Sequence, residues 1–148
     1  MDRQELLSNV AKLMNTQKLG VLATVGTPYP YTSLMTFAAT DDLRQIIFAT
    51  LRKTTKYSNM VANKYVSLLV DCALNKIDDL KKAVAVTVLG KVAEAGNGAR
   101  EVYRALLLKK NPELVAFLKE SECTIMVLAV DKYVYVDSFQ HVTEINME

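Results

Sequence analysis

The sequence is poor in the residues from which metal centres and hydrolytic active sites are built. Its 148 residues include two cysteines and one histidine, and Cys72, Cys123 and His141 are widely separated along the chain. Zinc usually takes three or four ligands at closer spacing, so no metal site is expected. Both cysteines fall in apolar runs and are predicted to be core residues. The acidic residues form no pair and a nucleophile-elbow motif is absent, which disfavours a hydrolase.

Excess charge and long apolar runs are lacking too. Eighteen basic and sixteen acidic residues give a formal net charge of +2, which is too small to hold a nucleic-acid backbone by electrostatics alone. The chain opens with Asp2, Arg3 and Glu5, without the basic-then-apolar order of a signal peptide. No apolar run reaches the roughly 20 residues of a membrane helix. We therefore expect no nucleic-acid or membrane partner and a cytoplasmic location.

Glycine is scarce, with five residues, and the glycine fingerprint of a dinucleotide-binding Rossmann fold is missing. The segment GTPYP at 26–30 follows a predicted strand but lacks the required glycine spacing. Strands and helices also fail to alternate regularly. A parallel, doubly wound architecture is therefore disfavoured.

What the chain does contain is a globular pattern. Apolar residues make up 51% and charged residues 23%, and the length favours a single domain over residues 1–148. Asp2 is expected to cap an opening helix, Gly26 with its neighbouring prolines to make a hairpin turn, and Gly90 to mark a bulge or bend. Strands are predicted at 19–26, 31–40, 45–51, 64–72, 83–95, 123–138 and 141–147, and helices at 2–17, 54–63, 75–82, 97–110 and from Pro112.

Six or seven strands with mostly local connections, and helices at the ends and edges, predict an α+β domain built on an antiparallel barrel. In the helix at 97–110, the spacing predicts a buried face formed by Val102, Leu106 and either Leu107 or Ala105.

The most informative segment, residues 45–72, has the pattern of a strand, a basic turn, a short helix and a strand. Cations and hydroxyl residues follow the first strand where the helix begins. A helix N-terminus supplies unpaired N–H donors and the positive end of a dipole, and lysine or arginine adds charge-assisted bonds. We interpret the turn as a phosphate anchor; a solvated turn is the alternative. Its candidate residues are Thr50, Arg52, Lys53, Thr54, Thr55 and Lys56.

This segment resembles the FMN-binding split barrels, the pyridoxamine 5′-phosphate oxidase-like fold, in which a similar F-x-T…R-K…N-P-x-V-S-L-L pattern recurs. Residues 48–50 match the end of the strand, Lys56 matches the phosphate-binding lysine, and residues 63–69 match the returning strand. Residues 30–42 resemble the strand that edges the isoalloxazine ring, and residues 88–95 are similar to a V-x-G-x-A strand. The resemblance runs in order through roughly residues 5–140.

The resemblance implies a six- to seven-stranded split β-barrel with peripheral helices, and one FMN per subunit at the interface of a homodimer. It implies that Lys56 and neighbouring hydroxyls hold the phosphate. It also implies that the ring lies across the strand at 31–40, where Ser33, Leu34, Met35 and Thr36 offer backbone groups to its polar edge.

The chain departs from the oxidase at several of the positions compared. Thr55 stands where the oxidase has an arginine beside the phosphate lysine, and Arg52 is the candidate replacement. Ser33 and Ala38 stand at the arginine and lysine positions of the ring-edging strand, and Ala85 stands at that of a flavin-contacting glutamine. The C-terminal substrate motif with arginine and tryptophan is absent. The resemblance therefore does not extend to the residues of vitamin B6 oxidation.

The expected function is that of an FMN oxidoreductase that passes electrons or hydride between a reduced nucleotide and a small-molecule acceptor. The residues identify no catalytic side chain. The alternatives are a non-catalytic flavin carrier or sensor, and a split barrel that binds deazaflavin or, through His141, haem.

Overall fold

The computed structural model describes residues 1–148 with the exception of 75, 77, 79–81 and 138–140. The helix expected at 75–82 falls largely outside the described residues. The helices are α1 (Arg3–Thr16), α2 (Thr55–Ala62) and α4 (Asn97–Lys110), with 3-10 turns η1 (Pro112–Leu114) and η2 (Phe117–Lys119). The strands are β1 (Leu19–Thr24), β2 (Tyr31–Thr36), β3 (Ala38–Ala39), β4 (Gln45–Leu51), β5 (Tyr65–Asp71), β6 (Ala85–Glu94), β7 (Cys123–Asp137) and β8 (His141–Asn146).

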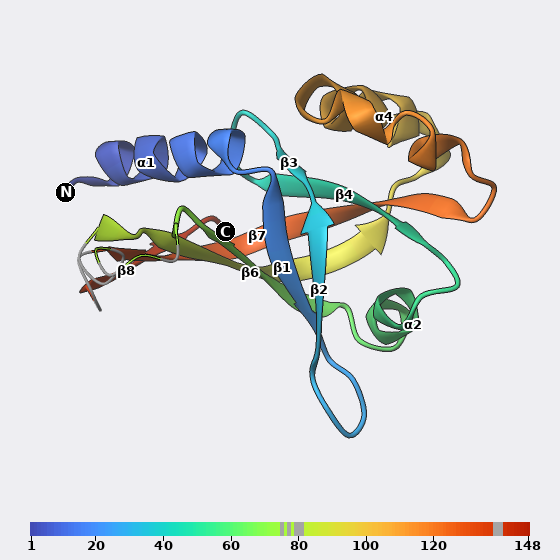
Figure 1. Ribbon diagram of the computed structural model, residues 1–148, viewed down its shortest axis with the longest axis horizontal. Coiled ribbons are helices and arrows are strands. Elements are labelled where there is room, and N and C mark those ends of the chain that lie inside the picture. The colour runs from blue at the N-terminus through green and yellow to red at the C-terminus, as the bar shows by residue number, and fades with distance from the viewer. Residues whose placement is uncertain (75, 77, 79–81, 138–140) are drawn as a thin grey trace.

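The strands form one antiparallel sheet that closes on itself (Figure 1). Its order is β2-β1-β5-β6-β7-β4-β3, with β8 added on β7. Phe37 alone separates β2 from β3, so the two ends of this order are consecutive parts of one strand. The ring therefore consists of β2 with β3, then β1, β5, β6, β7 and β4. This confirms the predicted α+β split barrel.

The interior of the barrel is filled by alternate residues of the strands and by the apolar face of helix α1. Along β5, Val66, Leu68 and Val70 are buried while the residues between them are more exposed, as expected for a strand with one face on the core. Helix α1 begins at its predicted cap, where the Asp2 carboxylate accepts from the Glu5 backbone N–H at 2.8 Å, and it lies against β3 and β5. The buried residues of α1 are Leu6, Val10, Leu13 and Met14.

A second apolar cluster lies outside the barrel, where α4 and the 3-10 turns cover β4 and β7. Leu107 is fully buried there, as predicted, but Val102 is 69% exposed and Ala105 is exposed. The inward stripe of α4 runs through Tyr103, Leu107 and Lys110, at the i, i+4, i+7 spacing of a single helix face. Val102 precedes this stripe by one residue and so faces solvent, which makes the prediction for it wrong.

Lys110, the last residue of α4, contacts both α1 and Phe37, the residue between β2 and β3. Its Nζ donates to the Met14 carbonyl at the end of α1 at 2.7 Å and lies 3.6 Å from the centroid of the Phe37 ring. Burial, and secondarily the charge of Lys18, lower the pKa of Lys110 to about 8. The Lys110 amine therefore connects the end of α4 to the end of α1, and it does so next to the Phe37 ring.

The bulge predicted at Gly90 is present. The register between β6 and β7 shifts between Leu89 and Gly90, so Asp131 is the extra residue on β7. A Cβ on Gly90 would lie 2.1 Å from the Ala129 carbonyl oxygen, a distance that no side chain tolerates. Gly90 thus allows two backbones to approach closely at the bulge.

We expect Gly90→Ala to lower the free energy of unfolding by about 1–3 kcal/mol, the range for inserted bulk in a packed site, as measured by urea denaturation. Gly98→Ala is the matched control, because a Cβ there meets nothing within 4 Å and alanine favours the helix. Equal stability of the two variants would contradict the steric role of Gly90.

Lys110 should give the stability a distinct pH dependence. Its pKa is lower in the folded protein, at about 8, than its ordinary value of 10.5, so the unfolded chain binds the proton more tightly. Its contribution to the free energy of unfolding should therefore rise as the pH increases from about 8 to about 10.5. Denaturation of wild type and Lys110→Met across this range measures the effect. A wild-type-minus-variant difference that stays flat or falls would refute it.

Candidate functional site

The turn between β4 and α2 is fixed by its threonines. Thr54 is the N-cap of α2: its hydroxyl accepts from the Tyr57 backbone N–H at 3.4 Å and donates to the Leu51 carbonyl at 2.7 Å. Thr50, which is buried on β4, lies with its Oγ1 3.3 Å from that of Thr54. A side-chain oxygen is favoured at the N-cap position of a helix. The hydrogen bonds of Thr50 and Thr54 therefore hold the turn in the conformation from which α2 begins.

This turn leaves several backbone donors unused. The first intrahelical bond runs from the Ser58 N–H to the Thr54 carbonyl. The N–H groups of Lys53, Thr55 and Lys56 have no acceptor within the described part of the chain. Thr55 and Lys56 are the first two residues of α2, so their N–H groups lie at the positive end of the helix dipole. Free N–H groups at a helix start are suited to an anion.

Lys56 adds a cation at the same place. Its side chain is half-buried, and burial alone lowers the pKa of its amine. Among the described residues it has no ion-pair partner. A partly desolvated ammonium without a carboxylate is stabilised by an anionic ligand, so Lys56 fits the phosphate role that the sequence predicts for it.

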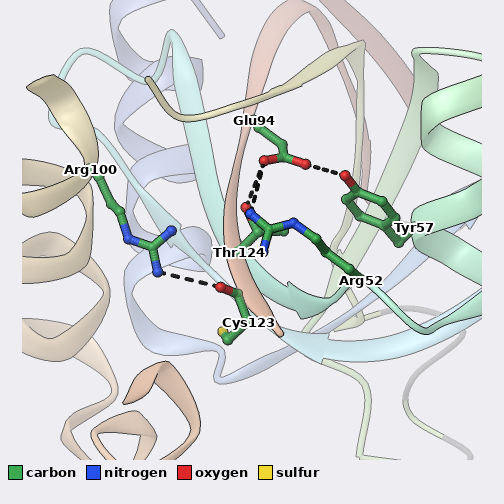
Figure 2. A network of polar contacts seen from close by, with 6 residues as sticks. All are labelled: Arg52, Tyr57, Glu94, Arg100, Cys123 and Thr124. Carbon is green, nitrogen blue, oxygen red and sulfur yellow. Dashed lines mark hydrogen bonds and ion pairs between the residues drawn. The ribbon is translucent and has the colours of Figure 1, made fainter. Parts of the chain in front are cut away.

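Arg52 is placed differently, because a carboxylate contacts it (Figure 2). Its Nη2 lies 3.4 Å from Oε2 of Glu94, the last residue of β6. The Tyr57 hydroxyl donates to Oε1 of Glu94, and the Thr124 hydroxyl donates to Oε2 at 3.1 Å. The bond from Tyr57 is the main cause of the lowered pKa of Glu94, so the carboxylate stays charged. We name Arg52, Tyr57, Glu94 and Thr124 the Glu94 network.

The remaining turn residues are exposed. Lys53 borders a surface hollow that it shares with Glu120 and Glu122, and Thr55 is the exposed first residue of α2. The structure therefore gathers Thr55 and Lys56 at the start of α2, while the side chains of Arg52 and Lys53 have acidic neighbours.

The second predicted part of the site is strand β2. One edge of β2 pairs with β1, and the described residues add no strand to its other edge. Met35 points into the core, Leu34 is 67% exposed, and Ser33 and Thr36 are half-buried. The unpaired edge offers backbone donors and acceptors. Helix α2 contacts both β1 and β2, so the helix that begins at the β4–α2 turn packs against the strand that carries this edge.

The sequence prediction did not include Tyr57, Glu94 or Thr124. One signal was available: alternation along β6 places Glu94 on the same face as the buried Gly90 and Val92, although Glu94 itself is exposed at the end of the strand. An acid that follows a buried stripe is a candidate for an ion pair. The identity of that partner depends on barrel closure, which spacing along the chain does not specify.

Comparison with known proteins gives a consistent result. The family model described as pyridoxamine 5′-phosphate oxidase matches residues 6–110, and no curated protein matches the chain. None of the helices in the described residues is both long and apolar enough to span a membrane.

Three solved structures share the fold at low identity. A haem-binding protein from Mycobacterium smegmatis has a TM-score of 0.81 at 17% identity, covering 92% of this chain and 56% of its own. General stress protein 26 from Bacillus anthracis has a TM-score of 0.74 at 18% identity, with 97% and 99% covered. An FAD-binding protein from Mesorhizobium loti has a TM-score of 0.71 at 18% identity, with 87% and 90% covered.

The chain thus spans little more than half of the haem-binding protein and nearly all of the other two. The family match takes in both β2 and the β4–α2 turn and covers well over half of the sequence. The chain therefore belongs to the pyridoxamine 5′-phosphate oxidase family.

Proposed function

We propose that this protein binds FMN and passes electrons or hydride between a reduced nucleotide and a small-molecule acceptor. The observation that carries the proposal is the start of α2, where backbone N–H groups and the half-buried Lys56 have no partner among the described residues and where the helix packs against β2. The solved structures with this fold include an FAD-binding protein, which supports a flavin ligand.

The residues fit the two ends of FMN. Its phosphate would accept from the N–H groups of Thr55 and Lys56, the Thr55 hydroxyl and the Lys56 ammonium. The polar edge of its ring would face the unpaired backbone of Ser33–Thr36. FMN would supply the redox chemistry, and these residues bind and orient it. With Ser33 and Ala38 at positions that are cationic in the oxidase, vitamin B6 oxidation is not proposed.

A homodimer is part of the proposal, because the sheet has an exposed apolar face beside the site. Leu34 on β2, Val21 on β1 and Leu69 on β5 are register partners, and Leu34 and Leu69 are 67% and 39% exposed. Tyr65, on the same side of β5 as Leu69, extends this face at 54% exposure. A second copy packed there would cover the open edge of β2 and the flavin lying on it.

Haem is a second candidate, favoured by the haem-binding protein of the same fold. His141 is the only histidine; it is exposed at the start of β8, with Nδ1 3.0 Å from Asp137 Oδ1. The visible spectrum of the purified protein separates the two ligands, since oxidised flavin and haem absorb differently. FMN with no turnover of reduced nicotinamide across a panel of dyes and quinones would instead identify a carrier.

Lys56→Ala should weaken FMN binding by about 1.5–3 kcal/mol, the range for hydrogen bonds to charged groups, which is about 10- to 150-fold in Kd. Quenching of flavin fluorescence measures it. Lys119→Ala, at an exposed lysine of η2, removes the same charge elsewhere and should leave the Kd unchanged. Equal affinity of the two variants would remove Lys56 from the phosphate site.

Leu34→Glu should convert the protein into a monomer, because a charge would be buried at the centre of the proposed interface. Analytical ultracentrifugation gives the mass. Val102→Glu is the matched control, since Val102 is 69% exposed on α4, outside the proposed face. A wild-type protein that sediments as a monomer, or a dimeric Leu34→Glu variant, would reject this interface.

A further inference from the structure

The Glu94 network adds a competing charge to the proposed phosphate site. Arg52 lies four residues before Lys56, and Tyr57 follows Lys56 directly on α2. Figure 2 shows Arg52 and Tyr57 converging on the Glu94 carboxylate from the turn and the helix. The turn that would hold an anion therefore carries, besides Lys56, an arginine that a carboxylate already contacts.

The Glu94 carboxylate accepts hydrogen bonds from two hydroxyl groups besides its contact with Arg52. The Tyr57 hydroxyl donates to Oε1, while Arg52 and Thr124 both donate to Oε2. When Arg52 leaves, each carboxylate oxygen still accepts from one hydroxyl. The release of Arg52 therefore leaves neither oxygen without a hydrogen bond, which removes the main penalty for breaking a partly buried ion pair.

The pair is also weak enough to break. Its side chains are 40% and 37% exposed, and the closest N···O distance is 3.4 Å, longer than a strong charge-assisted bond. A phosphate offers a guanidinium several oxygens in bidentate geometry. Arg52 thus has a better partner available once phosphate binds next to it.

We infer that Glu94 sets the affinity of the site for phosphate-bearing ligands by competing with the phosphate for Arg52. The inference rests on the proposed function and concerns how tightly its site holds the phosphate. Binding requires Arg52 to exchange Glu94 for the ligand, and the retained carboxylate opposes the incoming negative charge. The ligand is therefore held less tightly than Lys56 and a free arginine would hold it.

Glu94→Gln tests the inference, because glutamine keeps the shape and the oxygen that accepts from Tyr57 but removes the charge. We expect FMN to bind about two- to fivefold more tightly, the range set by a half-exposed ion pair, and riboflavin, which has no phosphate, to bind as it does to wild type. Glu144→Gln is the control: Glu144 forms a comparable pair with Lys132 at 3.1 Å on β8. Equal or weaker FMN binding by Glu94→Gln overturns the inference and would assign Glu94 to orienting Arg52.

Inorganic phosphate provides a readout without flavin. It should raise the Tm of Glu94→Gln more than that of wild type at each concentration, and that of Arg52→Ala less. The second variant keeps the test decisive if Glu94→Gln does not fold: an unchanged phosphate response in Arg52→Ala shows that Arg52 never reaches the ligand. If wild type binds neither FMN nor phosphate, the proposed function fails too. If wild type binds FMN but neither variant behaves as stated, the inference alone fails.

Discussion

The closure of the sheet at Phe37 is the constraint on which the rest of the structure depends. At this residue the chain leaves β1 as β2 and joins β4 as β3. The junction is held from outside the barrel: the Asn111 amide donates to the Phe37 carbonyl at 3.1 Å, and the Lys110 amine lies over the ring. Because the strand changes partners, β2 keeps one edge that no strand of the described residues pairs with. The candidate site exists because one strand serves both edges of the sheet.

Two basic side chains of the β4–α2 turn, Lys56 and Arg52, differ in whether an acidic residue contacts them. Lys56 has no carboxylate partner among the described residues, whereas Arg52 has Glu94. A second unpaired cation would repel Lys56, and the partly desolvated amine would then be still less stable when protonated. Arg52 is instead paired with an acid on β6, and Lys56 is left without one among the described residues. Lys56 therefore favours an anion at the start of α2, while Glu94 competes with that anion for Arg52.

Patterns of residues close in sequence predicted the helices and strands well. The predictions that failed or were not made concern contacts between residues far apart in the sequence. The Asp2 cap, the hairpin before β2, the strand–helix–strand around α2 and the bulge at Gly90 all depend on residues close in sequence or on a residue type with one evident use. Val102 failed because the orientation of α4 is set by its contact with β4 and β7, which selects Tyr103 and Leu107. The acidic partner of Arg52 was missed because β6 and the turn meet only through the barrel. The assignments of Thr50, Lys53 and Lys56 to a cofactor remain predictions.

The chemistry offered by this site comes mainly from backbone. The open edge of β2 and the first N–H groups of α2 are available whatever side chains occupy those positions, provided that the barrel closes and the helix begins where Thr54 caps it. Solved structures retain this fold at 17–18% identity. In the proposed site, side chains such as Lys56 and Glu94 would adjust how strongly an anion is held, and residues such as Ser33 and Ala38 would adjust which substrate is accepted beside it. The affinity for the ligand and the choice of substrate could therefore change separately on the same backbone.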